Sequence, residues 1–214
     1  MRILLTFSVL AGLALVYWYP IRKWYRRWGM TDAEVARTMA GDAAIADPPY
    51  QANMAITIAA RPAHIWPWLV QIGYRRGGLY SYDWLDRLFG YLDRPSAERI
   101  LPEFQQLAVG DVIPIGTGSG FPVVAVEQDR ALVLGGTTEG TQWSWEFGLY
   151  PLDEGHTRLV SRSRVRGPKT VAAFLVISLI EPAAFIMTRK MLLGLKRRAE
   201  TLATTRRHTR SHAA

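Results

Sequence analysis

Two carboxylates are the groups in this sequence best placed to do chemistry. Glu181 is the one charge within the apolar stretch VAAFLVISLIEPAAFIM, and a helix would put it on the same face as Ser178 and Phe185. Burial on that face would raise its pKa and suit it to proton transfer, or to contact with a polar group of a ligand. The structural alternatives are an ion pair with one of three arginines, Arg162, Arg164 or Arg189, and an exposed position near a kink made by Pro182.

The second carboxylate, Asp83, lies in the aromatic run YSYDW. It could act as a base or hold a ligand hydroxyl, and the alternative is that it caps a helix beginning near Trp84. Aromatic side chains offer a large apolar area with a polar edge, so those in this region could line a hydrophobic cavity instead of simply packing in the core. The candidates for such a lining are Trp66, Trp68, Tyr80, Tyr82, Trp84, Trp143 and Trp145.

Several other kinds of site are not supported. The chain has no cysteine, which excludes disulfides, thiol nucleophiles and cysteine-ligated metals. His64 lies in a helical stretch without an acidic or metal-binding neighbour, and the other histidines form no ligand set, so no metal is expected. The run GTGSG at 116–120 precedes the strand-like FPVV and not a helix, which argues against a phosphate loop. We therefore expect no cofactor.

The net charge of +8 is concentrated at the two ends of the chain. Residues 1–28 contain five arginines or lysines and no acid, and residues 188–214 contain eight against one glutamate, so the body from 29 to 187 carries −4. An acidic body does not resemble a nucleic-acid surface, and no nucleic acid is expected as a partner. Basic ends beside apolar segments fit the anionic headgroups of membrane lipids.

The N-terminus predicts a membrane anchor. The 17 residues from 3 to 19 contain no charge and would span about 26 Å as a helix, just enough to cross the hydrocarbon core. An aromatic belt and a basic cluster follow, made of Tyr17, Trp18, Tyr19, Arg22, Lys23, Trp24, Arg26 and Arg27. Because small residues are missing where a signal peptide would be cut, an uncleaved anchor is favoured over a cleaved signal or a buried helix. The charge bias predicts a single-pass protein of the cell membrane with its domain on the cytoplasmic side.

The next segments predict short helices around one strand. The sequence TDAE at 31–34 is a capping box that opens a short helix. Residues 54–58 alternate like a half-buried strand, and residues 62–72 are helical, with Pro67 expected to divide them into two short helices. The stretch SAERILPEFQQL suggests one further, broken helix.

From residue 109 onward the pattern becomes that of an antiparallel sheet. Short strands alternate with glycine-rich or polar turns, which indicates sequential hairpins. In the strand at 141–150, Trp143 and Trp145 share one face with Phe147 and Leu149. In the strand at 157–165, one face carries three arginines, Arg158, Arg162 and Arg164.

The last element, residues 168–203, is predicted to be one long helix with two different halves. The first half is apolar on all sides, with Glu181 and Pro182 in its middle. It could be a second membrane span, which would bury a charge at a cost of about 3 kcal/mol, or the helix that lies across a curved sheet with Glu181 facing a cavity. We favour the cavity helix. The basic second half is expected to emerge into solvent or onto lipid headgroups.

The order of strand, helix pair, antiparallel sheet and long C-terminal helix resembles the helix-grip fold of the START-like SRPBCC superfamily, which includes polyketide cyclase/dehydrase-like proteins. The likeness is greatest to bacterial membrane-anchored members and rests on the motifs WGMTDAE, ITIAARPAHIWPWLVQIG, GGLYSYDWLDRL, VGDVIP and EPAAFIMTRKMLLGLKRRAE. It implies an α+β fold in which a seven-stranded curved sheet, of which six strands are recognisable here, encloses an apolar cavity with the C-terminal helix.

The resemblance covers about residues 28–200. Together with the composition of the two ends, it divides the chain into an anchor and basic segment at 1–27, a short helix and linker at 28–50, a helix-grip domain at 51–203 and a disordered basic tail at 204–214. The leading hypothesis is a membrane-tethered domain that binds a hydrophobic or amphipathic small molecule, lipid or isoprenoid-like, in an internal cavity. Ser178, Glu181 and Phe185 join the aromatic candidates as its expected contacts. The alternatives are a cyclase- or dehydratase-type enzyme using Glu181 or Asp83 as acid or base, and a membrane-associated assembly factor whose aromatic segment 74–92 binds a protein.

Overall fold

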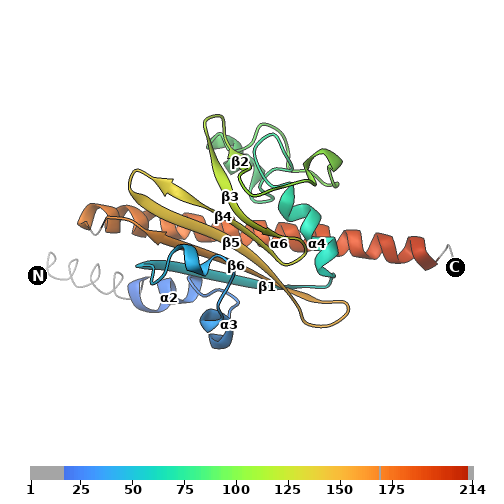
Figure 1. The fold of residues 1–214 in the computed structure, drawn as a ribbon, viewed down its shortest axis with the longest axis horizontal. Coiled ribbons are helices and arrows are strands. Elements are labelled where there is room, and N and C mark those ends of the chain that lie inside the picture. The colour runs from blue at the N-terminus through green and yellow to red at the C-terminus, as the bar shows by residue number, and fades with distance from the viewer. Residues whose placement is uncertain (1–16, 169, 212–214) are drawn as a thin grey trace, which may run out of the picture.

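A six-stranded antiparallel sheet crosses one long helix, α6, which extends beyond the sheet at both ends (Figure 1). The computed structural model describes residues 17–168 and 170–211, so most of the expected anchor helix lies outside the described residues. In chain order the elements are η1 (Tyr17–Ile21), α2 (Arg22–Tyr25), α3 (Asp32–Ala36), η2 (Asp42–Ala44), β1 (Tyr50–Ile58), α4 (Pro62–Val70), α5 (Asp83–Leu88), η3 (Pro102–Phe104), β2 (Val112–Ile115), β3 (Ser119–Glu127), β4 (Ala131–Thr138), β5 (Thr141–Pro151), β6 (Thr157–Arg166) and α6 (Val171–Ser211).

The strand order is β1-β6-β5-β4-β3-β2, so the first strand of the chain closes against the last. All neighbouring pairs are antiparallel, and β2 to β6 follow one another as hairpins, which confirms the sheet expected from the turns. The GTGSG run belongs to the β2–β3 hairpin. Within the described residues no seventh strand joins the sheet, and segment 74–108 contributes only to an isolated bridge between Gly73 and Gly78.

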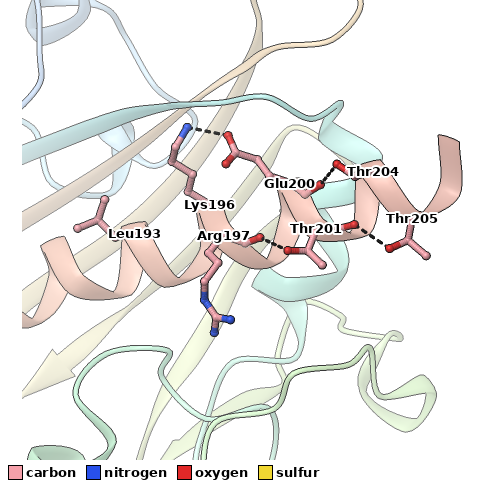
Figure 2. A pocket seen from close by; sticks show the side chains of 7 residues that line it. All are labelled: Leu193, Lys196, Arg197, Glu200, Thr201, Thr204 and Thr205. Atoms are coloured by element: carbon pink, nitrogen blue, oxygen red, sulfur yellow. Dashed lines mark hydrogen bonds and ion pairs between the residues drawn. The ribbon is translucent and has the colours of Figure 1, made fainter. Parts of the chain in front are cut away.

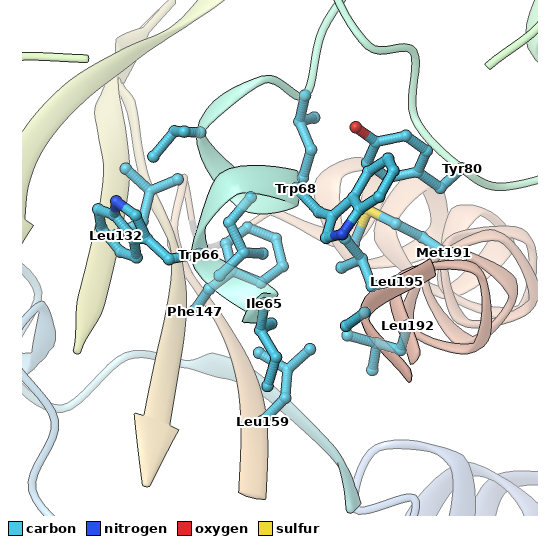
Figure 3. Packing of buried hydrophobic residues seen from close by; sticks show 14 of the residues in the cluster. Ile65, Trp66, Trp68, Tyr80, Leu132, Phe147, Leu159, Met191, Leu192 and Leu195 are labelled. Atoms are coloured by element: carbon cyan, nitrogen blue, oxygen red, sulfur yellow. The ribbon is translucent and has the colours of Figure 1, made fainter. Parts of the chain in front are cut away.

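One face of the sheet packs against α4 and the second half of α6 (Figure 3). Trp143 and Trp145 lie on this face with Phe147, as the alternation along β5 predicts. Burying one large apolar side chain contributes about 1.5–3 kcal/mol, so this layer is the main source of stability. Its fully buried members include Leu132, Phe147 and Leu159 from the sheet, Ile65 and Leu69 from α4, and Leu192 and Leu195 from α6.

The two halves of α6 are placed in the reverse of the expected way. The basic second half packs on the sheet, where Met191 and Leu192 are at most 2% exposed. The apolar first half, expected to lie across the sheet, is largely exposed, with Val171 at 76% and Leu179 at 81%. The second half has one apolar stripe between charged sides and therefore one face to bury, whereas the first half has no face that differs from the others. The helix continues to Ser211, where a disordered tail was expected from residue 204.

The expected division of α4 at Pro67 is wrong. The element is a single helix from Pro62 to Val70, with Pro62 in the first turn, where proline is well tolerated. Pro67 removes one backbone hydrogen bond. Burial of Ile65 and Leu69 against the sheet and α6 outweighs that loss and keeps the helix continuous.

The stretch SAERILPEFQQL contains only the short turn η3 instead of a broken helix. Its backbone bonds to the buried side chain of Gln71, just after α4. The Oε1 atom of Gln71 accepts from the N–H of Leu101 at 2.9 Å, and its Nε2 donates to the carbonyl of Arg99 at 3.1 Å. These long-range bonds replace helical ones, so the segment is an irregular cover fixed to the end of α4.

Residues 29–47 form a strap across the outer face of the sheet. Thr31 and Glu34 make the predicted capping box at the start of α3. Arg158 pairs with Glu34 at 2.6 Å. Arg162 and Arg164 pair with Asp42 at 2.6 and 2.9 Å. The strap is thus held by the three arginines that were expected to share one face of β6, Arg158, Arg162 and Arg164.

Acid is expected to weaken the strap through Glu34. The guanidinium of Arg158 lowers the pKa of Glu34 from 4.5 to about 2. Because the folded pKa lies below the unfolded one, the stabilisation is complete above about pH 5 and is lost as the pH falls toward 2. In urea titrations, the free energy of unfolding of the wild-type chain should exceed that of E34Q by about 1–3 kcal/mol at pH 7.

The difference in free energy of unfolding between wild type and E34Q should narrow by roughly half by pH 3. The matched control is E127Q, which breaks the pair between Glu127 and Arg130 on the surface, where Arg130 is 79% exposed. Its effect should be near zero at either pH. A gap for E34Q that does not change with pH would contradict the assignment.

Candidate ligand-binding site

Glu181 is buried in an ion pair with the N-terminal segment. Its side chain is 2% exposed and forms a bidentate ion pair with Arg22. Nε of Arg22 donates to Oε2 and Nη2 donates to Oε1, each at 2.6 Å. The hydroxyl of Tyr25 donates to Oε2 at 2.8 Å. The expected partners Arg162, Arg164 and Arg189 are wrong, and the partner is Arg22.

This pairing favours the structural interpretation of Glu181 over the catalytic one. Both carboxylate oxygens accept charge-assisted hydrogen bonds from within the protein. The hydroxyl of Tyr17 extends the contact by donating to the carbonyl of Ser178 at 3.1 Å. Sequence reasoning missed Arg22 and Tyr25, although a signal was present. Glu181 is the one acid in its apolar stretch, and Arg22 is the first base after the uncharged run at 3–19, so the two are natural partners.

A small internal pocket adjoins this ion pair, between α6 and strands β1 and β6. Its volume is about 40 Å³, which suits water molecules and not an organic ligand. Its lining combines apolar groups with three hydroxyl-bearing residues of β6 and α6, and consists of Tyr25, Tyr50, Ala52, Met54, Ser161, Ser163, Glu181, Ala184, Phe185 and Thr188. We call it the Glu181 pocket.

Three of the aromatic candidates belong to the packed core (Figure 3). Trp66, Trp68 and Tyr80 are at most 7% exposed, and Trp68 and Tyr80 meet edge to face at 6.0 Å. The Tyr80 hydroxyl accepts from Nε2 of Gln71 at 2.9 Å, and burial raises the pKa of Tyr80. The guanidinium of Arg198 covers the Tyr80 ring at 4.5 Å, so Tyr80 fixes the segment after α4 onto α6.

The other aromatic candidates do not form one site. Trp143 and Trp145 pack edge to face around Phe121, at 5.4 and 5.6 Å between ring centroids. Tyr82 lies under the ammonium of Lys190 at 5.4 Å. Trp84 is 63% exposed on α5.

Asp83 does not cap α5. It is the first residue of the helix, and its preceding residue, Tyr82, makes no side-chain cap. The carboxylate of Asp83 instead accepts from the N–H of Ser96 at 3.0 Å and from its hydroxyl at 2.7 Å. Reaching across to Ser96 satisfies both oxygens and ties α5 to the irregular cover.

A groove of ligand size lies at one end of the sheet, beside the apolar half of α6. Its volume is about 460 Å³, within the range of small-molecule sites. We call it the apolar groove, and it is lined by Arg22, Arg26, Pro49, Tyr50, Val165, Gly167, Pro168, Thr170, Val171, Ala173, Phe174 and Ile177. None of the ligand contacts expected from the sequence lines this groove, whose walls come from the start of α6, the sheet ends and α2.

Tyr50 lines both the apolar groove and the Glu181 pocket. The guanidinium of Arg26 lies over its ring at 4.6 Å, and burial raises the pKa of Tyr50 to about 12. The hydroxyl therefore stays neutral at physiological pH. Tyr50 thus belongs to both the outer groove and the interior pocket.

The first half of α6 and the N-terminal elements η1 and α2 lie at the same end of the molecule (Figure 1). By length and composition α6 could cross a membrane, and only 6% of its most apolar window is buried. Exposed apolar side chains on this half include Val171, Phe174, Leu175, Val176, Leu179, Ile180 and Ile186.

A further groove runs along the second half of α6 (Figure 2), with a volume of about 560 Å³. Lys196 pairs with Glu200 at 2.6 Å, and the threonine hydroxyls at 201, 204 and 205 donate to carbonyls one turn earlier. Lys196, Arg197 and Glu200 also bond to Thr57, Glu98 and Ala59 outside the helix. These polar groups are thus satisfied by the protein itself, which argues against a ligand there. Among the described residues, no cluster of acidic or histidine side chains could hold a metal ion.

The antiparallel sheet, with β1 closed on β6 and a long C-terminal helix across its inner face, is the arrangement expected from the sequence resemblance. The chain has the helix-grip fold. No protein-family model and no curated protein matches the sequence.

Solved structures match most of the chain at low identity. Protein MLL2253 of Mesorhizobium loti is 15% identical, with 71% of this chain and 98% of that chain covered and a TM-score of 0.41. The Aha1 dimer of Colwellia psychrerythraea is 19% identical (71% and 96% covered, TM-score 0.40), and norcoclaurine synthase of Thalictrum is 12% identical (74% and 96% covered, TM-score 0.42). Similarity at this level says nothing of the ligand or activity of this chain.

Breaking the buried ion pair should destabilise the helix-grip domain strongly. R22L leaves the Glu181 carboxylate without a counter-charge and should lower the free energy of unfolding by about 3–5 kcal/mol. The double variant R22L/E181L should recover most of that loss, because no isolated charge stays buried. Chemical unfolding in detergent micelles measures both.

The control for R22L is R27L, which removes the partner of Asp32, a side chain that is 94% exposed. R27L should cost at most about 1 kcal/mol. Equal losses in R22L and R27L would show that the Arg22–Glu181 pair is not buried as described.

Proposed function

We propose that this chain is a membrane-tethered helix-grip domain that binds a hydrophobic or amphipathic small molecule, of lipid or isoprenoid type. The observation that carries the proposal is the apolar groove, which has ligand size and opens beside the exposed apolar half of α6. The ligand site proposed here is this groove, with the Glu181 pocket as its inner end, because the pocket alone has room only for water.

Membrane attachment supplies the apolar surroundings that this end of the molecule requires. An isolated helix exposing side chains such as Phe174, Leu179 and Ile180 to water would forgo about 25 cal/mol for each Å² of apolar surface. A soluble domain rarely leaves so continuous an apolar surface uncovered. The uncharged run at 3–19 and the first half of α6 would then enter the same lipid layer, with the basic residues 22–27 at the cytoplasmic interface.

Tethering also explains how a sparingly soluble ligand would reach the groove. An apolar molecule dissolved in the membrane could pass along α6 into the groove without crossing water. The driving force would be burial of apolar area against Phe174, Ile177 and Val165, and polar groups at the rim would set orientation. The domain would act as carrier, sensor or chaperone for that molecule.

Filling the apolar groove should weaken binding. Ala173 lines the groove, whereas the adjacent Ala172 is exposed and does not. Full-length protein purified in mild detergent should carry an extractable amphiphile detected by mass spectrometry. A173F should lower the amount several-fold, because its ring occupies the groove, while A172F should match wild type.

Two results would contradict this proposal. One is the repeated absence of any amphiphile above the detergent background. The other is an equal amount bound by A173F and A172F, which would place the molecule elsewhere on the chain.

The cyclase or dehydratase alternative gains no support from the geometry, because both oxygens of Glu181 and of Asp83 are engaged within the fold.

The assembly-factor alternative has one observation in its favour. Trp84, Leu88 and Phe89, at 63%, 70% and 55% exposure, form an apolar surface on α5. If a protein partner docks there, W84A/L88A should lose it in a pull-down from solubilised membranes while amphiphile loading stays at the wild-type level. Unchanged capture by W84A/L88A would exclude this surface.

A further inference from the structure

A second groove adjoins the apolar groove and shares two of its arginines. Its volume is about 320 Å³. Four basic side chains line it, from Arg22, Lys23, Arg26 and Arg27, together with the polar groups of Gln51 and Asn53. We call it the basic groove, and no acidic residue is among its described lining.

Two of the four positive charges are already compensated. Arg22 pairs with Glu181, and Arg27 pairs with Asp32. For Lys23 and Arg26 the described residues provide no carboxylate partner within ion-pair distance. Arg26 donates from Nε to the carbonyl of Gln51 at 3.1 Å, which leaves its charge uncompensated. The basic groove thus has a surplus of two positive charges.

The position of these charges fits a membrane surface. Tyr19, just before the basic cluster in the sequence, and Trp24, within it, are exposed at 74% and 58%. Such aromatic residues favour the headgroup level of a bilayer. Arg26 lies on the shared rim, with the apolar groove and Phe174 on one side and Lys23 on the other. A molecule lying across this rim would place an apolar tail on one side and an anionic head on the other.

We propose that the basic groove binds the headgroup of an anionic phospholipid whose acyl chain lies in the apolar groove. This inference rests on the proposed function and adds the class of ligand. The phosphate oxygens would accept hydrogen bonds from the guanidinium of Arg26 and the ammonium of Lys23. A zwitterionic headgroup would bring its own cation next to these charges and gain less, so the site should select phosphatidylglycerol over phosphatidylcholine.

The test uses full-length protein in detergent, equilibrated with equal amounts of phosphatidylglycerol and phosphatidylcholine. After removal of free lipid, mass spectrometry gives the ratio of the two lipids bound. Wild type should be enriched in phosphatidylglycerol. Each charge removed should reduce the enrichment by roughly five-fold. K23Q, which changes an exposed side chain, tests one charge, and K23Q/R26Q tests both.

The matched control, R87Q/R130Q, removes the same net charge from exposed positions away from both grooves and should keep the wild-type ratio. No enrichment in wild type, or equal loss in the control, would overturn the proposal. Displacement of phosphatidylglycerol by equimolar inorganic phosphate would also overturn it, since a simple anion site would suffice. Occupation by a second copy of the chain, seen as a dimer that excludes lipid, would do the same.

The experiment separates this inference from the proposed function. If the ratio is flat while total bound lipid in wild type stays well above that in A173F, the headgroup site is wrong and the apolar site stands. If total bound lipid in wild type equals that in A173F, the proposed function itself fails, and this inference fails with it.

Discussion

The arrangement of this molecule depends on the buried ion pair between Arg22 and Glu181. A carboxylate with 2% exposure costs several kcal/mol unless a counter-charge reaches it, and its own helix offers none nearby. The N-terminal segment must therefore dock on α6 at this depth. Docking stacks Tyr25 on Phe185, with 5.4 Å between ring centroids, and brings Arg22 to the rim where both grooves meet.

The same constraint explains why α6 has two different roles. Beyond Glu181 toward its C-terminus, the helix presents one apolar stripe, and the sheet and α4 bury it in a dry core. Before Glu181 the helix is apolar on every side and the sheet covers little of it, so its exposed surface is suited to lipid. Glu181 lies at the boundary between these environments, where a charged group can be both buried in protein and close to a polar interface.

The sequence was sufficient for the sheet and insufficient for the site, for a physical reason. Strand alternation and turn residues are local signals, so the faces of β5 and β6 and the capping box at Thr31 were predicted correctly. The partner of Glu181 lies 159 positions away, and no local pattern specifies such a contact. Likewise, apolar periodicity shows that a helix half is hydrophobic but not what covers it, which is why the halves of α6 were assigned in reverse. Asp83 was misjudged and the role of Gln71 was not predicted, because their partners, Ser96 and Leu101, come from irregular chain.

Tyr50 is where recognition of an apolar tail and of an anionic head would be coupled. It lines both the apolar groove and the Glu181 pocket, and its ring lies beneath the guanidinium of Arg26. An acyl chain advancing from the groove toward the pocket would have to displace this ring, and a displaced ring no longer holds Arg26 by a cation–π contact. Conversely, a phosphate that draws Arg26 away would free Tyr50 to move. Tyr50 and Arg26 would therefore respond together to a ligand that fills the apolar groove and the basic groove, because one contact joins them.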